Sequence, residues 1–234
     1  MIVGMMAKRP ISDLLAVDDP AWPHLRDLLE RATVPVTVLP VEPRTGEEVL
    51  HRLQVTARSW LGAFALHTGA VLVDHGWLRM LGGGTTDLPD LASAGEPGFL
   101  VIARDVLGGR FAINGGALPG PSNEICYFAP DTLRWRPLGL AHAAFISSAV
   151  GGGLDGFYGK LRWPGWQDEV AALGPGQGFS IYPVLWSLEG RADLAANSRK
   201  VVPLSELVAF HEETARQLAD VPDGTQLSVS PPGF

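Results

Sequence analysis

The stretch FLVIARDVLGGRFAINGGALPGPSNEICYFAPDTLRW, residues 99–135 of a 234-residue chain, decides the fold. Its apolar runs are separated by Gly, Asn and Pro-Asp turn signals, which predicts a series of short strands. Because the connections are short, neighbouring strands should run antiparallel and form a meander. The strands are expected at 98–105, 110–113, 124–128 and 133–137.

Before this block the sequence predicts two helices and three strands. The first helix is expected to begin with Asp19 as its cap. The second follows a capping-box pattern at 45–48 and continues at helical spacing to near Gly69. One strand at 34–41 is expected at a sheet edge because of its prolines, and two more flank a hinge at His75–Gly76.

After this block the chain is expected to be mainly helical. Helices are predicted at 142–150, 155–161, about 163–173 and 205–219, one strand at 179–188, and a loose tail at 221–234. We therefore predict a single α+β domain over 10–220. Its fold is a mostly antiparallel curved sheet with helices packed on one face and a helical C-terminal extension.

Composition and charge narrow the class of partner. Lys and Arg total 18 and Asp and Glu total 25, which gives a formal net charge of −7. With no Lys/Arg cluster denser than Arg199–Lys200, we expect no nucleic-acid partner.

The most apolar region, 60–81, is interrupted by His, Asp and Gly, so we expect no membrane span. Residues 1–15 lack the pattern of a secretion signal, and the single Cys126 suits a reducing compartment; both indicate the cytoplasm.

The motifs of well-known catalytic sites are absent from the sequence. The segment LGGGTTD, residues 81–87, follows a strand but lacks the Gly-Lys-Ser/Thr of a phosphate loop. No nucleophile elbow and no His-Glu-x-x-His zinc helix occurs. We therefore expect no cofactor and no metal, and the sequence favours a protein that is not an enzyme.

One local group of residues could carry catalysis. His67, Asp74 and His75 would have to converge in a cleft to act as an acid/base or hydrolytic site. The alternative is structural: a capping His67, a solvated Asp74 in a turn, and a His75 that packs beside Trp77.

Four further residues are candidates for binding. Asp105 ends an apolar strand before a Gly-Gly turn, where a carboxylate can accept turn N–H groups, and Asn114 occupies the end of the return strand. Trp163 and Trp166 could form the walls of an apolar ligand pocket or pack a helix onto the sheet. We favour the structural role for Asp105 and Asn114 and the packing role for the two tryptophans.

Seven segments in order carry a resemblance to a known family: DPAWP, LQVTARS, VDHGWLRMLGGG, DVLGGRFAINGGA, YFAPDTLRW, FYGKLRWPGW and YPVLWSLEG. Together they resemble the bacterial domain-of-unknown-function family 2625 over about residues 19–218. That family has no established activity, so the resemblance implies no catalytic residue.

A looser likeness covers about residues 45–151. An apolar strand, an Asp, a Gly-Gly turn and an alternating strand, residues 101–113, look like the core pattern of the SUKH superfamily. The resemblance implies an α+β core in which helices pack on a curved antiparallel sheet. Many SUKH proteins are immunity proteins that bind and neutralise a toxin. It thus implies a toxin as the protein partner.

These observations lead to two functional hypotheses. The first is a non-enzymatic, cytoplasmic protein-binding domain of the immunity type, whose acidic surface would cover a basic cleft of a toxin. The second is a small-ligand-binding protein or a hydrolase with a site near His67, Asp74 and His75.

Overall fold

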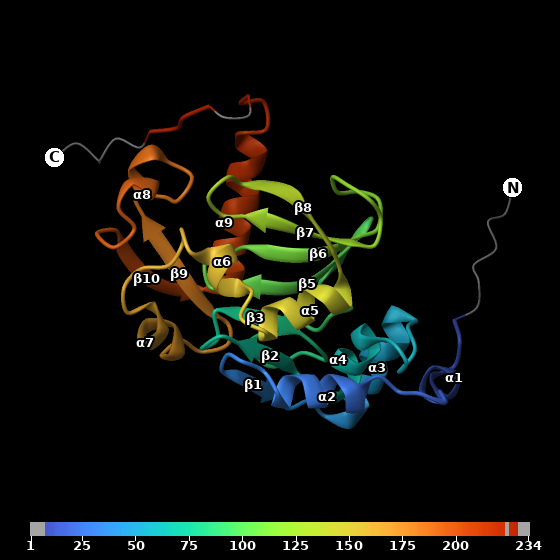
Figure 1. Cartoon of the computed structure of the whole chain (residues 1–234). Coiled ribbons are helices and arrows are strands. Elements are labelled where there is room, and N and C mark those ends of the chain that lie inside the picture. The colour runs from blue at the N-terminus through green and yellow to red at the C-terminus, as the bar shows by residue number, and fades with distance from the viewer. Residues whose placement is uncertain (1–7, 223–224, 229–234) are drawn as a thin grey trace, which may run out of the picture.

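An antiparallel sheet of 8 strands forms the centre of the computed structural model, which describes residues 8–222 and 225–228 (Figure 1). The strand order is β1-β2-β3-β5-β6-β7-β8, and β4 pairs only with β5. The predicted α+β class and mostly antiparallel sheet are confirmed. The strands are β1 Val36–Leu39, β2 Ala70–Val73, β3 Leu78–Leu81, β4 Gly95–Glu96, β5 Phe99–Asp105, β6 Arg110–Asn114, β7 Glu124–Ala129 and β8 Arg134–Ala141.

The central meander lies where the sequence predicts it. Strands β5 to β8 pair in order, and each pair is antiparallel. Register shifts between Val101 and Ala103 in β5 and between Glu124 and Cys126 in β7 interrupt the ladder. Such bulges increase the local twist of a sheet. The β5–β6 turn contains Gly108 at a φ of +83°, a conformation that glycine adopts without strain.

The N-terminal helices correct two predictions. The expected single helix from 45 to near Gly69 is wrong, because Gln54 takes a left-handed conformation and ends the first helix. Ser59 then caps a second helix by accepting the N–H of Gly62. Side chains of Asp19 and Thr45 do not cap, since the caps are Ala21 and Glu42. The helices are α1 Ile11–Leu15, α2 Trp22–Glu30, α3 Pro43–Leu53 and α4 Trp60–His67.

The main sheet carries helices on both faces, whereas the sequence predicts them on one face. Two helices, α5 (His142–Val150) and α6 (Leu154–Tyr158), lie in front of the strands in Figure 1, and α9 (Leu204–Gln217) lies behind them. Phe111 of β6 contacts Phe145 of α5, with ring centroids 4.8 Å apart. Its neighbour Arg110 contacts Glu212 of α9. Successive residues of a strand point to opposite faces, so these contacts assign each helix to its face.

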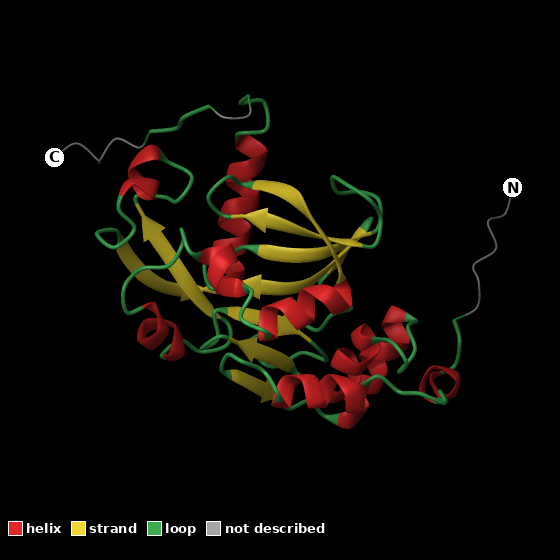
Figure 2. Cartoon of the chain, viewed as in Figure 1, coloured by secondary structure: helices red, strands yellow, loops and turns green. Residues whose placement is uncertain are grey.

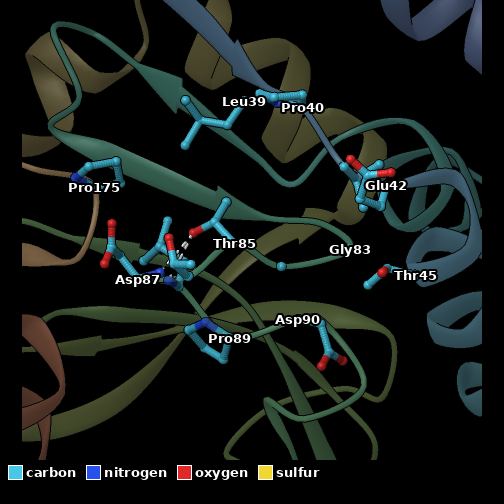
Figure 3. Close-up of a pocket in the computed structure, with 14 residues that line it drawn as sticks. Leu39, Pro40, Glu42, Thr45, Gly83, Thr85, Asp87, Pro89, Asp90 and Pro175 are labelled. Carbon is cyan, nitrogen blue, oxygen red and sulfur yellow. Dashed lines mark hydrogen bonds between the residues drawn. The ribbon is translucent and has the colours of Figure 1, made fainter.

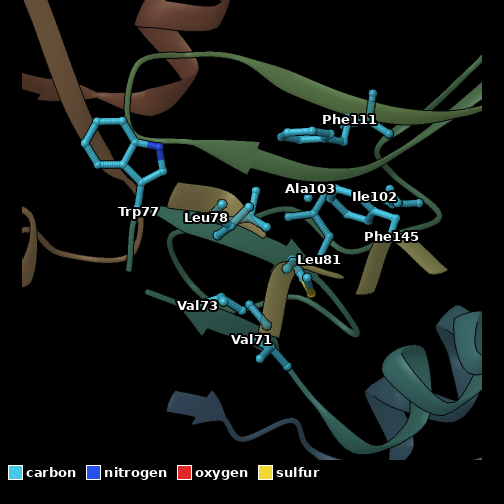
Figure 4. Packing of buried hydrophobic residues seen from close by; sticks show 14 of the residues in the cluster. Val71, Val73, Trp77, Leu78, Leu81, Ile102, Ala103, Phe111 and Phe145 are labelled. Atoms are coloured by element: carbon cyan, nitrogen blue, oxygen red, sulfur yellow. The ribbon is translucent and has the colours of Figure 1, made fainter. Parts of the chain in front are cut away.

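The hydrophobic core fills the space between the sheet and α4, α5 and α6. Figure 4 shows apolar side chains from β2, β3, β5 and β6 packed together. Val71, Leu78 and Ala103 are completely buried in it. Trp77 extends this core beyond the start of β3 toward the C-terminal segment.

The C-terminal extension contains strands as well as helices (Figure 2). Its elements are α7 Trp166–Ala171, β9 Gln177–Tyr182, α8 Leu188–Ala192, β10 Ser198–Pro203 and α9. Strands β9 and β10 form a separate antiparallel pair. Strand β10 was not predicted, because its first half, 198–200, is polar. The predicted strand at 179–188 corresponds to β9, which ends at Tyr182 instead of continuing to 188.

The expected loose tail is only partly described. Leu227 forms a parallel bridge with Ser187, and its carbonyl accepts the N–H of Leu188 at 2.8 Å. Residues 223–224 and 229–234 lie outside the described residues, as do residues 1–7 at the other end.

Candidate functional site

Asp105 is the centre of a buried hydrogen-bond cluster. Its Oδ1 accepts the N–H groups of Leu107 and Gly109, at 2.9 and 2.8 Å. Its Oδ2 accepts the hydroxyls of Tyr127 and Tyr158, at 2.8 and 2.9 Å. The cluster therefore ties the β5–β6 turn to β7 and α6.

The pKa shifts and the tight packing of this cluster indicate a structural role. Burial raises the pKa of Asp105, and its four hydrogen bonds oppose that shift without cancelling it. Burial also raises the pKa of Tyr127 and Tyr158 well above the ordinary value, and the Asp105 carboxylate adds to the effect. A Cβ at Gly109 would lie 2.1 Å from Asp105 Oδ2, so only glycine fits there. Asp105 has no free oxygen to present to a ligand.

Asn114 organises the loop that follows β6. Its Oδ1 accepts the N–H groups of Gly116 and Leu118, and its Nδ2 donates to the carbonyls of Leu118, Gly120 and Pro121. The residue is completely buried. Because the side-chain amide of Asn114 already bonds the backbone of the loop, we assign it a structural role and not the binding of a ligand.

Asp74 forms an ion pair with Arg162, and both side chains are 7% exposed. The expectation of a solvated Asp74 is wrong. Asp74 and His75 both have positive φ, 56° and 59°, in the tight turn between β2 and β3. This turn brings Asp74 to a residue 88 positions further along the chain.

The predicted packing role of the two tryptophans fits their burial. Trp163 and Trp166 are 2% and 8% exposed. The guanidinium of Arg162 lies 3.9 Å from the ring centroid of Trp166 and 4.9 Å from that of Trp77. These contacts use ring surface that an apolar ligand would need.

The three catalytic candidates do not converge. His67 ends α4 and stacks on Trp22, with ring centroids 4.8 Å apart, and burial lowers its pKa. Asp74 and His75 lie at the other end of β2 from His67. His75 is exposed and meets Trp166 edge-on rather than Trp77. Within residues 8–222 and 225–228, no three His, Cys, Asp or Glu side chains form a group that could hold a metal.

A surface hollow of about 690 Å³ lies beside the end of β1 and the loop after β3 (Figure 3). We call it the acidic hollow. It is lined by Leu39, Pro40, Val41, Glu42, Thr45, Gly83, Gly84, Thr85, Thr86, Asp87, Leu88, Pro89, Asp90 and Pro175.

Local hydrogen bonds give the loop at 83–90 its shape. Thr85 Oγ1 accepts the N–H groups of Asp87 and Leu88, and the carbonyl of Leu88 accepts the N–H of Thr85. Gly84 has a φ of +92°, and a Cβ there would lie 3.0 Å from the backbone nitrogen of Asp90. The glycines of LGGGTTD therefore serve a tight loop.

The charge of the hollow is negative. Figure 3 shows Glu42, Asp87 and Asp90 around it, and no Lys, Arg or His of the described part of the chain lines it. Burial alone would raise the pKa of Asp90, but hydrogen bonds from Ser93 and Arg52 lower it below the ordinary value. Because Arg52 pairs with Asp90 at 3.2 Å, Glu42 and Asp87 are the acids that repel phosphate and attract an amine or a guanidinium.

Sequence reasoning missed these three acids because they come from separate segments. Glu42 precedes α3, whereas Asp87 and Asp90 lie in the loop after β3. Only LGGGTTD gave any signal, and it indicated a turn.

Comparison with known proteins places the chain in a family. The family described as protein of unknown function DUF2625 matches residues 11–207. The chain belongs to the DUF2625 family.

Two relatives of this DUF2625 protein are themselves uncharacterised. It is similar to the uncharacterized protein YbfG of Escherichia coli (strain K12), with 38% identity over 206 residues, 85% of this chain and 94% of the relative. It is also similar to an uncharacterized protein of Haemophilus influenzae, with 32% identity over 186 residues, 75% of this chain and 82% of the relative. No solved structure matches it significantly.

The DUF2625 match includes the acidic hollow and the Asp105 cluster and ends within α9. Among the described residues of this DUF2625 protein, no helix has both the length and the apolar character needed to cross a bilayer.

Proposed function

We propose that this DUF2625 protein is a non-catalytic, cytoplasmic binding domain whose acidic hollow receives a basic segment of a partner protein. The observation that carries the proposal is the lining of the hollow. Among the described residues, three carboxylates line it and no basic side chain does (Figure 3). Arg52, outside the lining, pairs with Asp90, so Glu42 and Asp87 supply the uncompensated charge.

The interior acids argue for binding rather than for catalysis. Asp105 and Asp74 are both buried; both oxygens of Asp105 accept hydrogen bonds, and Asp74 pairs with Arg162. A general acid or base must reach a proton of the substrate, and neither residue lines the acidic hollow. The acids that do line the hollow can attract a cation.

The dimensions of the hollow suit side chains of a partner. Its volume of about 690 Å³ can hold one or two Lys or Arg side chains. Each solvent-exposed ion pair would contribute up to about 1 kcal/mol, so affinity would also need apolar contacts around the hollow. Leu39, Val41 and Pro89 offer such contacts at its wall. Charge would mainly speed association and select the partner.

The finer form of the proposal is an immunity-type role in which the partner is a basic toxin. It is supported by the likeness of residues 45–151 to the SUKH pattern and by the net charge of −7. Thr45 and the loop 83–90 of the hollow fall within that part of the chain.

Affinity capture from native lysate, followed by titration with the recovered partner, tests the proposal. The full chain is compared with E42Q/D87N, which removes two charges from the hollow. The control D18N/E206Q removes two exposed charges elsewhere. We expect E42Q/D87N to weaken binding about tenfold or more and to reduce its salt dependence, while D18N/E206Q binds normally.

Two outcomes would contradict this function. One is a partner that E42Q/D87N holds as tightly as the unmodified chain does. The other is no recovered partner of basic charge across several growth conditions.

A further inference from the structure

Three arginines lie side by side across the sheet on the face that α9 covers. Arg79 of β3 is the cross-strand partner of Arg104 of β5, and Arg104 is the partner of Arg110 of β6. Directly opposite residues in an antiparallel pair share a face. We call these residues the arginine row.

The two outer arginines have partners. Arg79 is 1% exposed and donates from Nε to the carbonyl of Pro175 at 3.0 Å. Arg110 bonds Glu96 and Glu212 through Nη1, and its guanidinium lies 4.9 Å from the ring centroid of Phe128. Each of these charges is therefore at least partly compensated.

The middle arginine is different. Within residues 8–222 and 225–228, Arg104 forms no hydrogen bond and no ion pair, and its Nε is buried. Nε of Arg110 is buried without a partner as well. Those two Nε atoms are closed off from solvent, but the Nη groups of Arg104 are not, and an anionic group of a ligand could pair with them.

A cavity of about 200 Å³ lies beside these atoms, between the sheet and α9. We call it the α9 pocket. It is lined by Ser93, Ala94, Gly95, Glu96, Val101, Arg104, Arg110, Ser205, Val208, Ala209 and Glu212. Its polar groups have both signs, and its remaining wall is small and aliphatic.

The charges of the pocket match a ligand that is itself neutral overall. The guanidinium charges of Arg104 and Arg110 equal the carboxylate charges of Glu96 and Glu212 in number. A phosphate would meet Arg104 but would be repelled by both glutamates, whose side chains are 44% and 40% exposed. A simple amine would meet the glutamates but would be repelled by Arg104.

We propose that the α9 pocket binds a free α-amino acid with a small aliphatic side chain. The carboxylate accepts from Arg104, the ammonium donates to Glu96 and Glu212, and the side chain contacts Val101 and Val208. This site is separate from the acidic hollow, because the two have no lining residue in common.

Calorimetric titration of the full chain tests this proposal with three matched probes. L-Valine carries both charged groups, isovalerate lacks the ammonium, and isobutylamine lacks the carboxylate. We expect L-valine to bind and each analogue to bind at least tenfold more weakly, because each loses charge-assisted hydrogen bonds. R104Q should weaken L-valine binding tenfold or more, and R44Q, at an exposed arginine, should leave it unchanged.

A second variant tests the same pocket without changing any residue of the arginine row. Ala209 is an exposed residue of α9 that lines the pocket, so A209W should fill the pocket without removing a charge. It should abolish L-valine binding and leave the thermal unfolding temperature close to that of the unmodified chain.

Several results would overturn the proposal. Isovalerate or inorganic phosphate binding as tightly as L-valine would show a plain anion site, and isobutylamine doing so would show a cation site. Unchanged L-valine affinity in a folded R104Q or A209W variant, or no heat at millimolar L-valine, would remove the site. None of these results depends on E42Q/D87N, so failure here and failure of the proposed function are distinguishable.

Discussion

The Asp105 carboxylate lies wholly inside the protein and accepts hydrogen bonds from four donors. Two come from its own turn and two from tyrosines in β7 and α6. Burial of a carboxylate is costly, and this bonding makes it tolerable. One side chain thus joins a local turn to two distant elements.

Replacing Asp105 by Asn should lower the free energy of unfolding by about 3 kcal/mol. All four partners of Asp105 are hydrogen-bond donors. The NH₂ group of Asn is also a donor, so it could not accept the bonds that one carboxylate oxygen accepts. The matched variant Y158F removes one hydrogen bond and should cost about 1 kcal/mol. Urea unfolding measures both values. Equal costs for the two variants would show that Asp105 is not the organising group.

The Asp74–Arg162 pair should be worth more than a similar pair nearer the surface. Arg199 also stacks on a tryptophan, Trp163, and also pairs with a carboxylate, Glu169, but the side chain of Arg199 is 20% exposed and that of Glu169 is 39% exposed. R162Q should destabilise the protein by about 3–5 kcal/mol because it leaves Asp74 buried and unpaired. R199Q should cost about 1 kcal/mol. Denaturant unfolding of the two variants side by side decides this, and a smaller loss for R162Q would refute it.

At the scale of elements, one polar side chain gives the loop after β6 its shape. Asn114 bonds the backbone at four positions between Gly116 and Pro121. These backbone N–H and C=O groups lie outside helices and strands, so the conformation of the loop depends on the hydrogen bonds from Asn114.

The variant N114A should release that loop while the sheet remains formed. Amide exchange at Gly116 and Leu118, whose N–H groups Asn114 accepts, should rise at least tenfold. Exchange in β7 should change little. S122A, at an exposed position of the same loop, serves as the control, and unchanged exchange in N114A would contradict the role.

Sequence patterns located elements whose signals are local and missed those that depend on distant contacts. The Gly-Gly turn after Asp105 and the alternation around it predicted the meander. The break at Gln54 was missed because apolar spacing continues across it, while a left-handed residue stops the helix. Strand β10 was missed because its partner is β9 and its first three residues are polar. Asp74 was placed in solvent since its partner Arg162 is 88 residues away.

At the scale of the whole molecule, two histidines, one partly buried and one buried, link stability to pH. Burial lowers the pKa of His142, the first residue of α5, and of His211, on α9, from 6.5 to about 4 in each case. The Gly108 carbonyl opposes this shift at His211, and Arg110 adds to it. Between about pH 4 and pH 6.5 the folded protein therefore binds fewer protons than the unfolded chain does.

The stabilising effect of the neutral rings is complete above about pH 6.5 and is lost as the pH falls toward 4. We expect each histidine to account for about 1–2 kcal/mol of lost stability between pH 7 and pH 5. H142Q and H211Q should each flatten the curve of unfolding free energy against pH over that range. H24Q controls for the loss of an exposed histidine, and parallel curves for all three variants would contradict the linkage.

The arginine row also bears on how the newly made chain avoids mispairing its strands. If β5 slid by one residue against its neighbours, Arg104 would turn into the layer where Phe111 and Phe145 meet. A lone cation among aromatic rings and methyl groups would make that misfolded sheet unstable. The same charges would make it unfavourable for a strand of a second chain to pair with the sheet in the wrong register. We therefore expect the guanidinium groups of the arginine row to favour the native strand register during folding and to oppose aggregation through mispaired strands.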